Sequence, residues 1–259
     1  MIYLELIGPH KRNSKTLAFA GARPSVPGSG ENRASDFHNP ALVMREIIKK
    51  GTGNSMLISV ILGHPNKKSF NHAIAETTIE MLTQNGHEVL FHDLYEEKFD
   101  PVLPSGEILR DELIPEEIET HCKEVAEADG IIIIHPNWWG QPPAILKGWV
   151  DRVIRPGIAY EFIENDKGEG IPNGLLKATS AIVFNTSNTE TKREQEVFGD
   201  PLETVWKNCI FGLCGVNVFY RRMFNIMVVS SEEDRENWLK EVRRTVNDYY
   251  PKVTRIKKT

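Results

Sequence analysis

The chain has 259 residues, a formal net charge of -5 and an isoelectric point near 5.9. Its hydrophobic and charged shares, 40% and 26%, are those of an ordinary globular protein, and its length suits one buried core with an appendage. No apolar run approaches the roughly 18 residues that span a bilayer, and the chain lacks the basic balance that favours nucleic acid, so we expect neither membrane insertion nor a nucleic-acid partner.

Residues 1–55 differ in character from the rest of the chain. They are dense in Gly, Pro, Ser, Asn and Arg and show no sustained period of 2 or 3.6 residues. We expect this segment to be disordered or to be a non-native extension. The organised domain is then expected to span residues 56–259.

From Met56 onward, short apolar runs alternate with amphipathic runs, which is typical of βαβ units around a parallel sheet. In chain order the predicted elements are a strand at 57–62, a helix at 69–84, a strand at 88–94, a helix at 115–128, a strand at 130–135, a helix from Pro143 to about Val153, a strand at 180–185, a helix at 200–214, a strand at 216–219 and a helix at 232–249.

Local signals support several of these elements. Four consecutive isoleucines at 131–134 suit a strand that is buried on both faces. Pro143 suits the first position of a helix, and Asp200 with Pro201 and Glu203 has the cap, proline and acid of a helix start. Together the elements predict an α/β fold, a flavodoxin-like doubly wound five-stranded parallel sheet with helices on both faces.

Ligands of such sheets bind beyond the carboxyl ends of the strands, so the loops there are the candidate site. The first loop, residues 63–71, leads into a helix whose free N–H groups and dipole attract phosphate, and Ser69 and Asn71 add polar side chains. Taken alone, this pattern fits a plain N-cap at Ser69 in a solvated loop better than it fits a phosphate site.

Two further loops carry unusual residues. Trp138 and Trp139 are adjacent in a loop that proline and glycine constrain, and exposed aromatic side chains on a rigid turn are typical of a planar-ligand site. The alternative is that one of the two belongs to the core or to a subunit interface. The third loop, residues 185–189, is a run of small polar residues that fits either a ligand contact or a plain loop.

Other kinds of chemistry find no support in the sequence. The eight histidines lack HExxH or other paired ligand spacing, so no metal site is predicted. No GxSxG elbow and no Walker A motif occur. The three cysteines, Cys122, Cys209 and Cys214, are an odd number without CxxC spacing, and the chain opens without a secretory pattern. We therefore expect a cytoplasmic protein.

Several motifs together resemble the NAD(P)H quinone reductases with a flavodoxin-like fold, the DT-diaphorase family. They are HPNKKSFN at 64–71, DLY at 93–95, FDP at 99–101, and above all PNWWGQPPAILKGWVDRV at 136–153 followed by GIAY at 157–160. The likeness runs from about Met56 to Tyr250. It implies a flavoprotein that passes two electrons from NAD(P)H through a flavin to a quinone-like acceptor by ping-pong hydride transfer, and a homodimer.

The resemblance also implies the residues of the site. Cofactor binding is implied for His64, Ser69, Phe70, Asn71, Pro136, Asn137, Trp138, Trp139, Thr186, Ser187, Asn188 and Arg235. The substrate pocket is implied to contain Trp138, Trp139 and Tyr160, with no side-chain nucleophile. Arg235 aligns with a residue that reaches the adenylate in relatives that use FAD, so FAD is expected, with FMN as the alternative.

The chain departs from the family pattern in two places. Ser187 and Asn188 stand where relatives have two glycines in a Thr-Gly-Gly turn. Lys192 or Arg193, and Phe198, stand near the positions of a Tyr and a His that assist the reduced ring in some relatives. Any such assistance must be absent here or come from other groups.

Three other functions share parts of this pattern. Flavin-binding regulatory subunits of potassium-efflux systems carry the same motifs. The hypothesis of a flavodoxin that carries single electrons is weakened because the Thr/Ser-rich phosphate loop of flavodoxins is missing here. A domain of this fold that has lost its cofactor is the remaining alternative.

Overall fold

The computed structural model describes residues 54–108, 113–164 and 170–253. The expectation for residues 1–55 therefore lies almost wholly outside the described residues. The strands are β1 (Leu57–Leu62), β2 (Glu88–Asp93), β3 (Gly130–Pro136), β4 (Tyr160–Glu164), β5 (Gly170–Gly174), β6 (Ser180–Thr186) and β7 (Val218–Phe224). The helices are α2 (Phe70–Asn85), α3 (Glu116–Glu127), α4 (Ala144–Val153), α5 (Thr191–Glu196), α6 (Pro201–Glu203) and α7 (Glu232–Tyr249), with short 3-10 helices η1 (Ser105–Glu107) and η3 (Met227–Val229) and a π-helix η2 (Thr204–Phe211).

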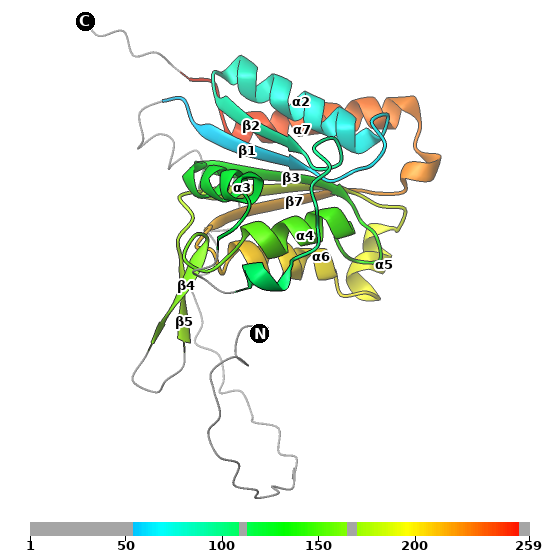
Figure 1. Cartoon of the computed structure of the whole chain (residues 1–259). Coiled ribbons are helices and arrows are strands. Elements are labelled where there is room, and N and C mark those ends of the chain that lie inside the picture. Colours follow the sequence, from blue (N-terminus) through cyan, green and yellow to red (C-terminus); the bar gives the residue numbers. More distant parts are fainter. Residues whose placement is uncertain (1–53, 109–112, 165–169, 254–259) are drawn as a thin grey trace, which may run out of the picture. The chain divides into compact units, whose positions relative to one another are not determined.

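Five parallel strands form the main sheet in the order β2-β1-β3-β6-β7. This is the flavodoxin-like order, so the predicted fold class is confirmed. The three central strands are almost completely buried because helices cover both faces. As Figure 1 shows, α2 and α7 lie side by side on one face, and α3, α4 and α6 lie on the other.

The alternating side chains of the strands build two cores. Ile131 and Ile133 point to the core under α3 and α4, whereas Ile132 and Ile134 point to the core under α2 and α7. The four isoleucines of β3 therefore serve both faces, as the sequence indicated. No helix among the described residues is both long enough and apolar enough to cross a bilayer.

The structure corrects several element boundaries. β7 runs from Val218 to Phe224 and not over 216–219, because Arg221 and Arg222 find acidic partners and stay within the strand. The β4–β5 antiparallel pair and α5 were not predicted. Pro143 is the N-cap of α4 and not its first residue.

The helix start predicted at Asp200 is only partly right. Pro201 does occupy the first turn, but α6 lasts three residues and continues as the π-helix η2. Asp200 has a left-handed backbone with φ of 47°, and its side chain makes no capping hydrogen bond. It instead forms an ion pair with Arg221, which shows that a buried charge outweighed the local capping signal.

Candidate functional site

Three loops meet beyond the carboxyl ends of β1, β3 and β6, which are neighbours in the sheet. Between them lies a cavity of about 230 Å³. Its lining residues are His64, Ser69, Phe70, Asn71, Pro136, Asn137, Trp138, Thr186, Ser187, Asn188 and Met227. The topology alone brings these segments together, although up to about 160 residues separate them along the chain.

The loop after β1 is fixed by its own polar groups. The backbone N–H of Asn66 donates to Nδ1 of His64, and its side chain accepts from the N–H of Lys68. Because Nδ1 of His64 is an acceptor, the neutral ring carries its hydrogen on Nε2. Burial first, and then the neighbouring His72, lower the pKa of His64, so that ring is neutral near pH 7. Ser69 then caps α2 by accepting from the N–H of His72.

The loops after β3 and β6 are joined to each other and to α2 through Thr186. Asn71 donates from Nδ2 to Thr186 Oγ1 at 3.0 Å, and the backbone N–H of Asn137 donates to the carbonyl of Thr186 at 2.7 Å. The N–H of Ser187 donates to the carbonyl of Phe224, which ties the third loop to β7. The cavity wall is therefore one hydrogen-bonded unit.

The two tryptophans stand on a tight two-residue turn. Trp138 and Gln141 exchange both backbone hydrogen bonds, and Trp139 and Gly140 have φ of 58° and 71°. Positive φ at both central positions is the type I′ geometry, which glycine favours and tryptophan does not. A Cβ on Gly140 would lie 2.9 Å from Pro201, so this turn is seated against the start of α6. Trp138 is 43% exposed and Trp139 fully exposed, and neither belongs to the core.

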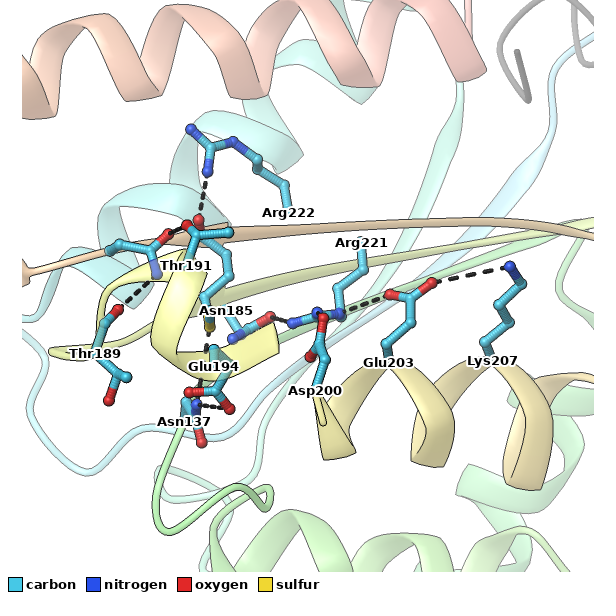
Figure 2. Close-up of polar contacts among 12 residues, drawn as sticks. Asn137, Asn185, Thr189, Thr191, Glu194, Asp200, Glu203, Lys207, Arg221 and Arg222 are labelled. Atoms are coloured by element: carbon cyan, nitrogen blue, oxygen red, sulfur yellow. Dashed lines mark hydrogen bonds and ion pairs between the residues drawn. The ribbon is translucent and has the colours of Figure 1, made fainter. Parts of the chain in front are cut away.

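A buried acid holds the start of this turn, as Figure 2 shows. Nδ2 of Asn137 donates to Oε1 of Glu194 on α5 at 3.1 Å, and Oδ1 of Asn137 accepts from the N–H of Gly140 at 3.0 Å. Glu194 is 1% exposed. The amide of Asn137 is thus bonded at both ends, and the turn is rigid before any ligand enters.

Behind this acid, Arg221 on β7 bridges three groups (Figure 2). It forms ion pairs with Asp200 and Glu203 and donates to Oδ1 of Asn185 at 3.2 Å. Asn185 immediately precedes Thr186, so Arg221 links the third loop to α6. Neither Glu194 nor Arg221 could be predicted from the sequence, because the two partners of each contact are distant in the chain.

Most of the predicted site residues are thus brought together. All of the predicted cofactor-binding residues except Trp139 and Arg235 line the cavity. Arg235 lies in the first turn of α7, where its Nε donates to Ser230 Oγ at 2.9 Å. Tyr160 is 9% exposed at the start of β4. The cavity shows which of the predicted residues lie together, and the role of every predicted site residue stays a prediction. Met227 lines the cavity and was not predicted.

The donors and acceptors of the cavity fit a ligand that carries a phosphate and hydroxyl groups. The N-terminus of α2 supplies N–H groups that have no carbonyl partner within the helix. Asn71 is 2% exposed, and its Oδ1 has no hydrogen-bond partner among the described residues. Because an unpaired buried acceptor costs about 1–3 kcal/mol, a ligand hydroxyl would relieve it.

A second polar cluster lies outside the cavity, at the junction of β2 and α3. His92, Glu97 and His121 place possible metal-ligating atoms within 4.8 Å of one another. However, both ring nitrogens of His92 face carboxylates, those of Glu97 and Glu124. Nδ1 of His121 accepts from Trp149, so its hydrogen is on Nε2, the atom that faces Glu97. The geometry therefore fits a hydrogen-bonded ion pair around His92 better than a metal site.

Comparison with known proteins gives the class of protein to which this cavity belongs. A family profile described as a flavodoxin-like fold matches residues 56–248, and the chain belongs to that family. The chain is 34% identical over 178 residues to an uncharacterized NAD(P)H oxidoreductase of Haemophilus influenzae, which covers 67% of this chain and 86% of the relative. It is 30% identical over 200 residues to the ribosyldihydronicotinamide dehydrogenase (quinone) of Mus musculus, 69% of this chain and 85% of the relative.

Solved structures agree with these relatives. An NAD(P)H:quinone oxidoreductase from Methanothermobacter marburgensis superposes with a TM-score of 0.65 at 27% identity, covering 75% of this chain and 97% of that one. The resemblance to the quinone reductase family that the motifs indicated is therefore confirmed.

Proposed function

We propose that this protein is a flavin-dependent NAD(P)H:quinone oxidoreductase that binds its flavin in the cavity beyond β1, β3 and β6. The observation that carries the proposal is the cavity itself. The motifs that resemble the family's flavin loops, distant in sequence, line one space at the carboxyl edge of the sheet. The names of the relatives support the same reaction class.

When bound, the flavin supplies the redox chemistry, taking hydride from NAD(P)H and passing two electrons to the acceptor. The chain supplies binding and orientation. The N-terminus of α2 and Ser69 would hold phosphate, Oδ1 of Asn71 would accept from a hydroxyl, and Trp138 would offer a flat apolar wall. The rigid turn that Asn137 and Glu194 hold would keep this wall in place.

We propose FAD as the flavin, with FMN as the alternative. Met227 lines the cavity, and the chain continues from it through Ser230 to Arg235, whose side chain is fixed by Ser230. An arginine held on the segment that leaves the cavity suits the second phosphate or the adenine of FAD. Mass spectrometry of the cofactor released from the purified protein decides between the two.

We also propose that a second copy of the chain completes the site. At about 230 Å³ the cavity is smaller than the roughly 300–1,000 Å³ that encloses a ligand of this size, so one copy would cover only part of a flavin. Trp139, Phe162 and Phe198 expose large apolar side chains that a partner would bury. Light scattering should give a dimer mass, and Trp139→Ala should weaken the dimer. The cytoplasmic location stays a prediction.

The function is tested by spectroscopy of purified protein reconstituted with FAD or FMN. Anaerobic NADPH should bleach the flavin bands, and menadione should restore them. Asn71→Ala should weaken flavin binding about tenfold, since a hydrogen bond to Thr186 and an acceptor are lost, whereas Asn173→Ala, on β5, should bind normally.

The outcomes separate the alternatives. Failure to bind any flavin would refute the proposed function. Tight flavin binding with negligible turnover would favour the regulatory flavoprotein. A stable one-electron reduced state on titration would favour the electron carrier.

A further inference from the structure

A line of three side chains runs from the cavity into the protein beneath the start of α2. Ser69 Oγ, which lines the cavity, lies 3.0 Å from Nδ1 of His72. Nε2 of His72 lies 3.1 Å from Oδ2 of Asp93, the last residue of β2. The side chains of His72 and Asp93 are 12% and 13% exposed. The line connects a cavity hydroxyl to a carboxylate through one imidazole ring.

The carboxylate of Asp93 is held in place from its other side. Its Oδ1 accepts from the backbone N–H groups of Tyr95 and Glu96, at 3.1 and 3.2 Å. Oδ2 is therefore left to face His72, and it accepts a hydrogen bond from the N–H at Nε2 of that ring. In the neutral ring Nδ1 is then an acceptor.

The hydroxyl of Ser69 has only one hydrogen, and this limits what it can offer the cavity. With His72 neutral, that hydrogen must point to Nδ1, while Oγ accepts from the backbone N–H of His72 at 3.3 Å. Ser69 then turns only a lone pair toward the cavity, which an anion does not favour. With His72 protonated, Nδ1 donates to Oγ and the hydroxyl hydrogen is free to donate into the cavity.

We propose that His72 takes up a proton when a phosphate group binds beside Ser69, and that Asp93 stabilises the charged ring. The proton comes from solvent and stays on Nδ1 of His72. Ser69 is the group that touches the ligand, and His72 and Asp93 are positioning residues. The inference rests on the proposed function, because it takes the phosphate to be that of the flavin.

The charged and titratable groups around His72 agree with this assignment. The ring centroid of His64, on the loop before α2, lies 6.2 Å from that of His72. Burial together with His72 lowers the pKa of His64. Of these two rings among the described residues, only that of His72 has a carboxylate in contact, that of Asp93. Lys67 and Glu96, which flank the loop and β2, form an exposed ion pair with each other.

The experiment is a calorimetric titration of the protein with FAD near pH 7.5, in buffers of different ionisation enthalpy. The slope of the observed enthalpy against the buffer's ionisation enthalpy gives the protons taken up. FAD is the suitable probe because its phosphates do not titrate near this pH, and riboflavin, which has no phosphate, is the matched ligand. We expect net proton uptake with FAD, none with riboflavin, and weaker FAD binding as the pH rises.

Variants assign the proton. His72→Gln should remove the uptake and weaken FAD binding about tenfold, because a charge-assisted hydrogen bond becomes a neutral one or is lost. Asp93→Asn keeps the shape and should reduce the uptake, and it serves if His72→Gln fails to fold. His92→Gln, which alters a histidine paired with carboxylates outside the cavity, should leave the uptake unchanged.

Each other outcome has a distinct meaning. If the unchanged protein binds FAD without taking up a proton, the inference is overturned while the proposed function stands. The same holds if His72→Gln and Asp93→Asn both take up as many protons as the unchanged protein does. No binding of FAD or FMN to the unchanged protein overturns both.

Discussion

Mild acid should destabilise this protein through His135, the last residue but one of β3. The side chain is fully buried. Trp206 donates from Nε1 to its Nε2 at 3.0 Å, and its Nδ1 donates to the carbonyl of Pro136 at 2.8 Å. A second proton on Nε2 would face the Trp206 N–H. Burial, opposed by the bond to Pro136 and helped by Arg221, lowers the pKa of His135 to about 4.

The direction in which stability changes with pH follows from the pKa of His135 in the folded and the unfolded chain. In the unfolded chain the ring has its ordinary pKa of 6.5, so on acidification the unfolded state binds the proton first. The stabilisation is fully present above pH 6.5 and is lost as the pH falls toward 4. For these two pKa values the loss is about 2 kcal/mol by pH 5 and about 3 kcal/mol by pH 4. This is a large share of the roughly 5–15 kcal/mol that stabilises a typical domain.

The measurement is urea unfolding of the unchanged protein and of His135→Gln at pH 7.5, 6 and 5. Glutamine can accept from Trp206 and donate to Pro136 but does not titrate. The variant should be less stable at pH 7.5, and the difference should shrink by about 2 kcal/mol at pH 5. His121, whose pKa burial also lowers to about 4, is present in both proteins and cancels. A difference that stays constant to within about 0.5 kcal/mol would refute the reasoning.

Three further changes test an ion pair, a close packing contact and a helix cap elsewhere in the domain by the same unfolding measurement. Arg152 and Glu107 form a buried bidentate ion pair, so Glu107→Gln should lower the free energy of unfolding by about 3–5 kcal/mol. Replacing Arg152 by Met and Glu107 by Leu together should lower it less than Glu107→Gln alone, and a larger loss for the double change would contradict this. A Cβ on Gly148 would lie 2.2 Å from the carbonyl oxygen of Pro101, so Gly148→Ala should cost about 3 kcal/mol or more, and a neutral result would show that α4 can shift. Ser231→Ala removes the capping box of α7 and should cost about 1 kcal/mol, which an unchanged midpoint would exclude.

The fold was predictable because its signals are local and periodic. The three central strands, Leu57–Leu62, Gly130–Pro136 and Ser180–Thr186, are mostly apolar runs, because burial on both faces favours apolar side chains at consecutive positions. β7 was placed too short because it is an edge strand that carries two arginines, and their partners are far along the chain. The β4–β5 pair lies outside the main sheet and lacks a clear alternation of polar and apolar residues.

The cavity was predictable for a different reason. Parallel strands place their following loops at one edge of the sheet, so three correctly placed strands bring His64, Trp138 and Thr186 together without further information. The contacts that hold those residues in place could not be predicted from the sequence. His72 and Asp93 are 21 residues apart and Asn137 and Glu194 are 57 apart, and no spacing rule links either pair.

The loop at Ser187 and Asn188 shows how such distant contacts change the reading of a motif. Two glycines at these positions would allow close approach of a ligand and a free backbone. Neither residue here has positive φ, so the loop does not need glycine. Ser187 Oγ accepts from the N–H of Thr189, and Asn188 Oδ1 accepts from the N–H of Val228, at 3.1 and 3.0 Å. Ser187 thus bonds within its own loop and Asn188 bonds to backbone that follows β7, so this loop is held by side-chain hydrogen bonds where two glycines would leave it free. The departure from the family motif is therefore compatible with the cavity, and it makes the position of the η3 segment part of the site.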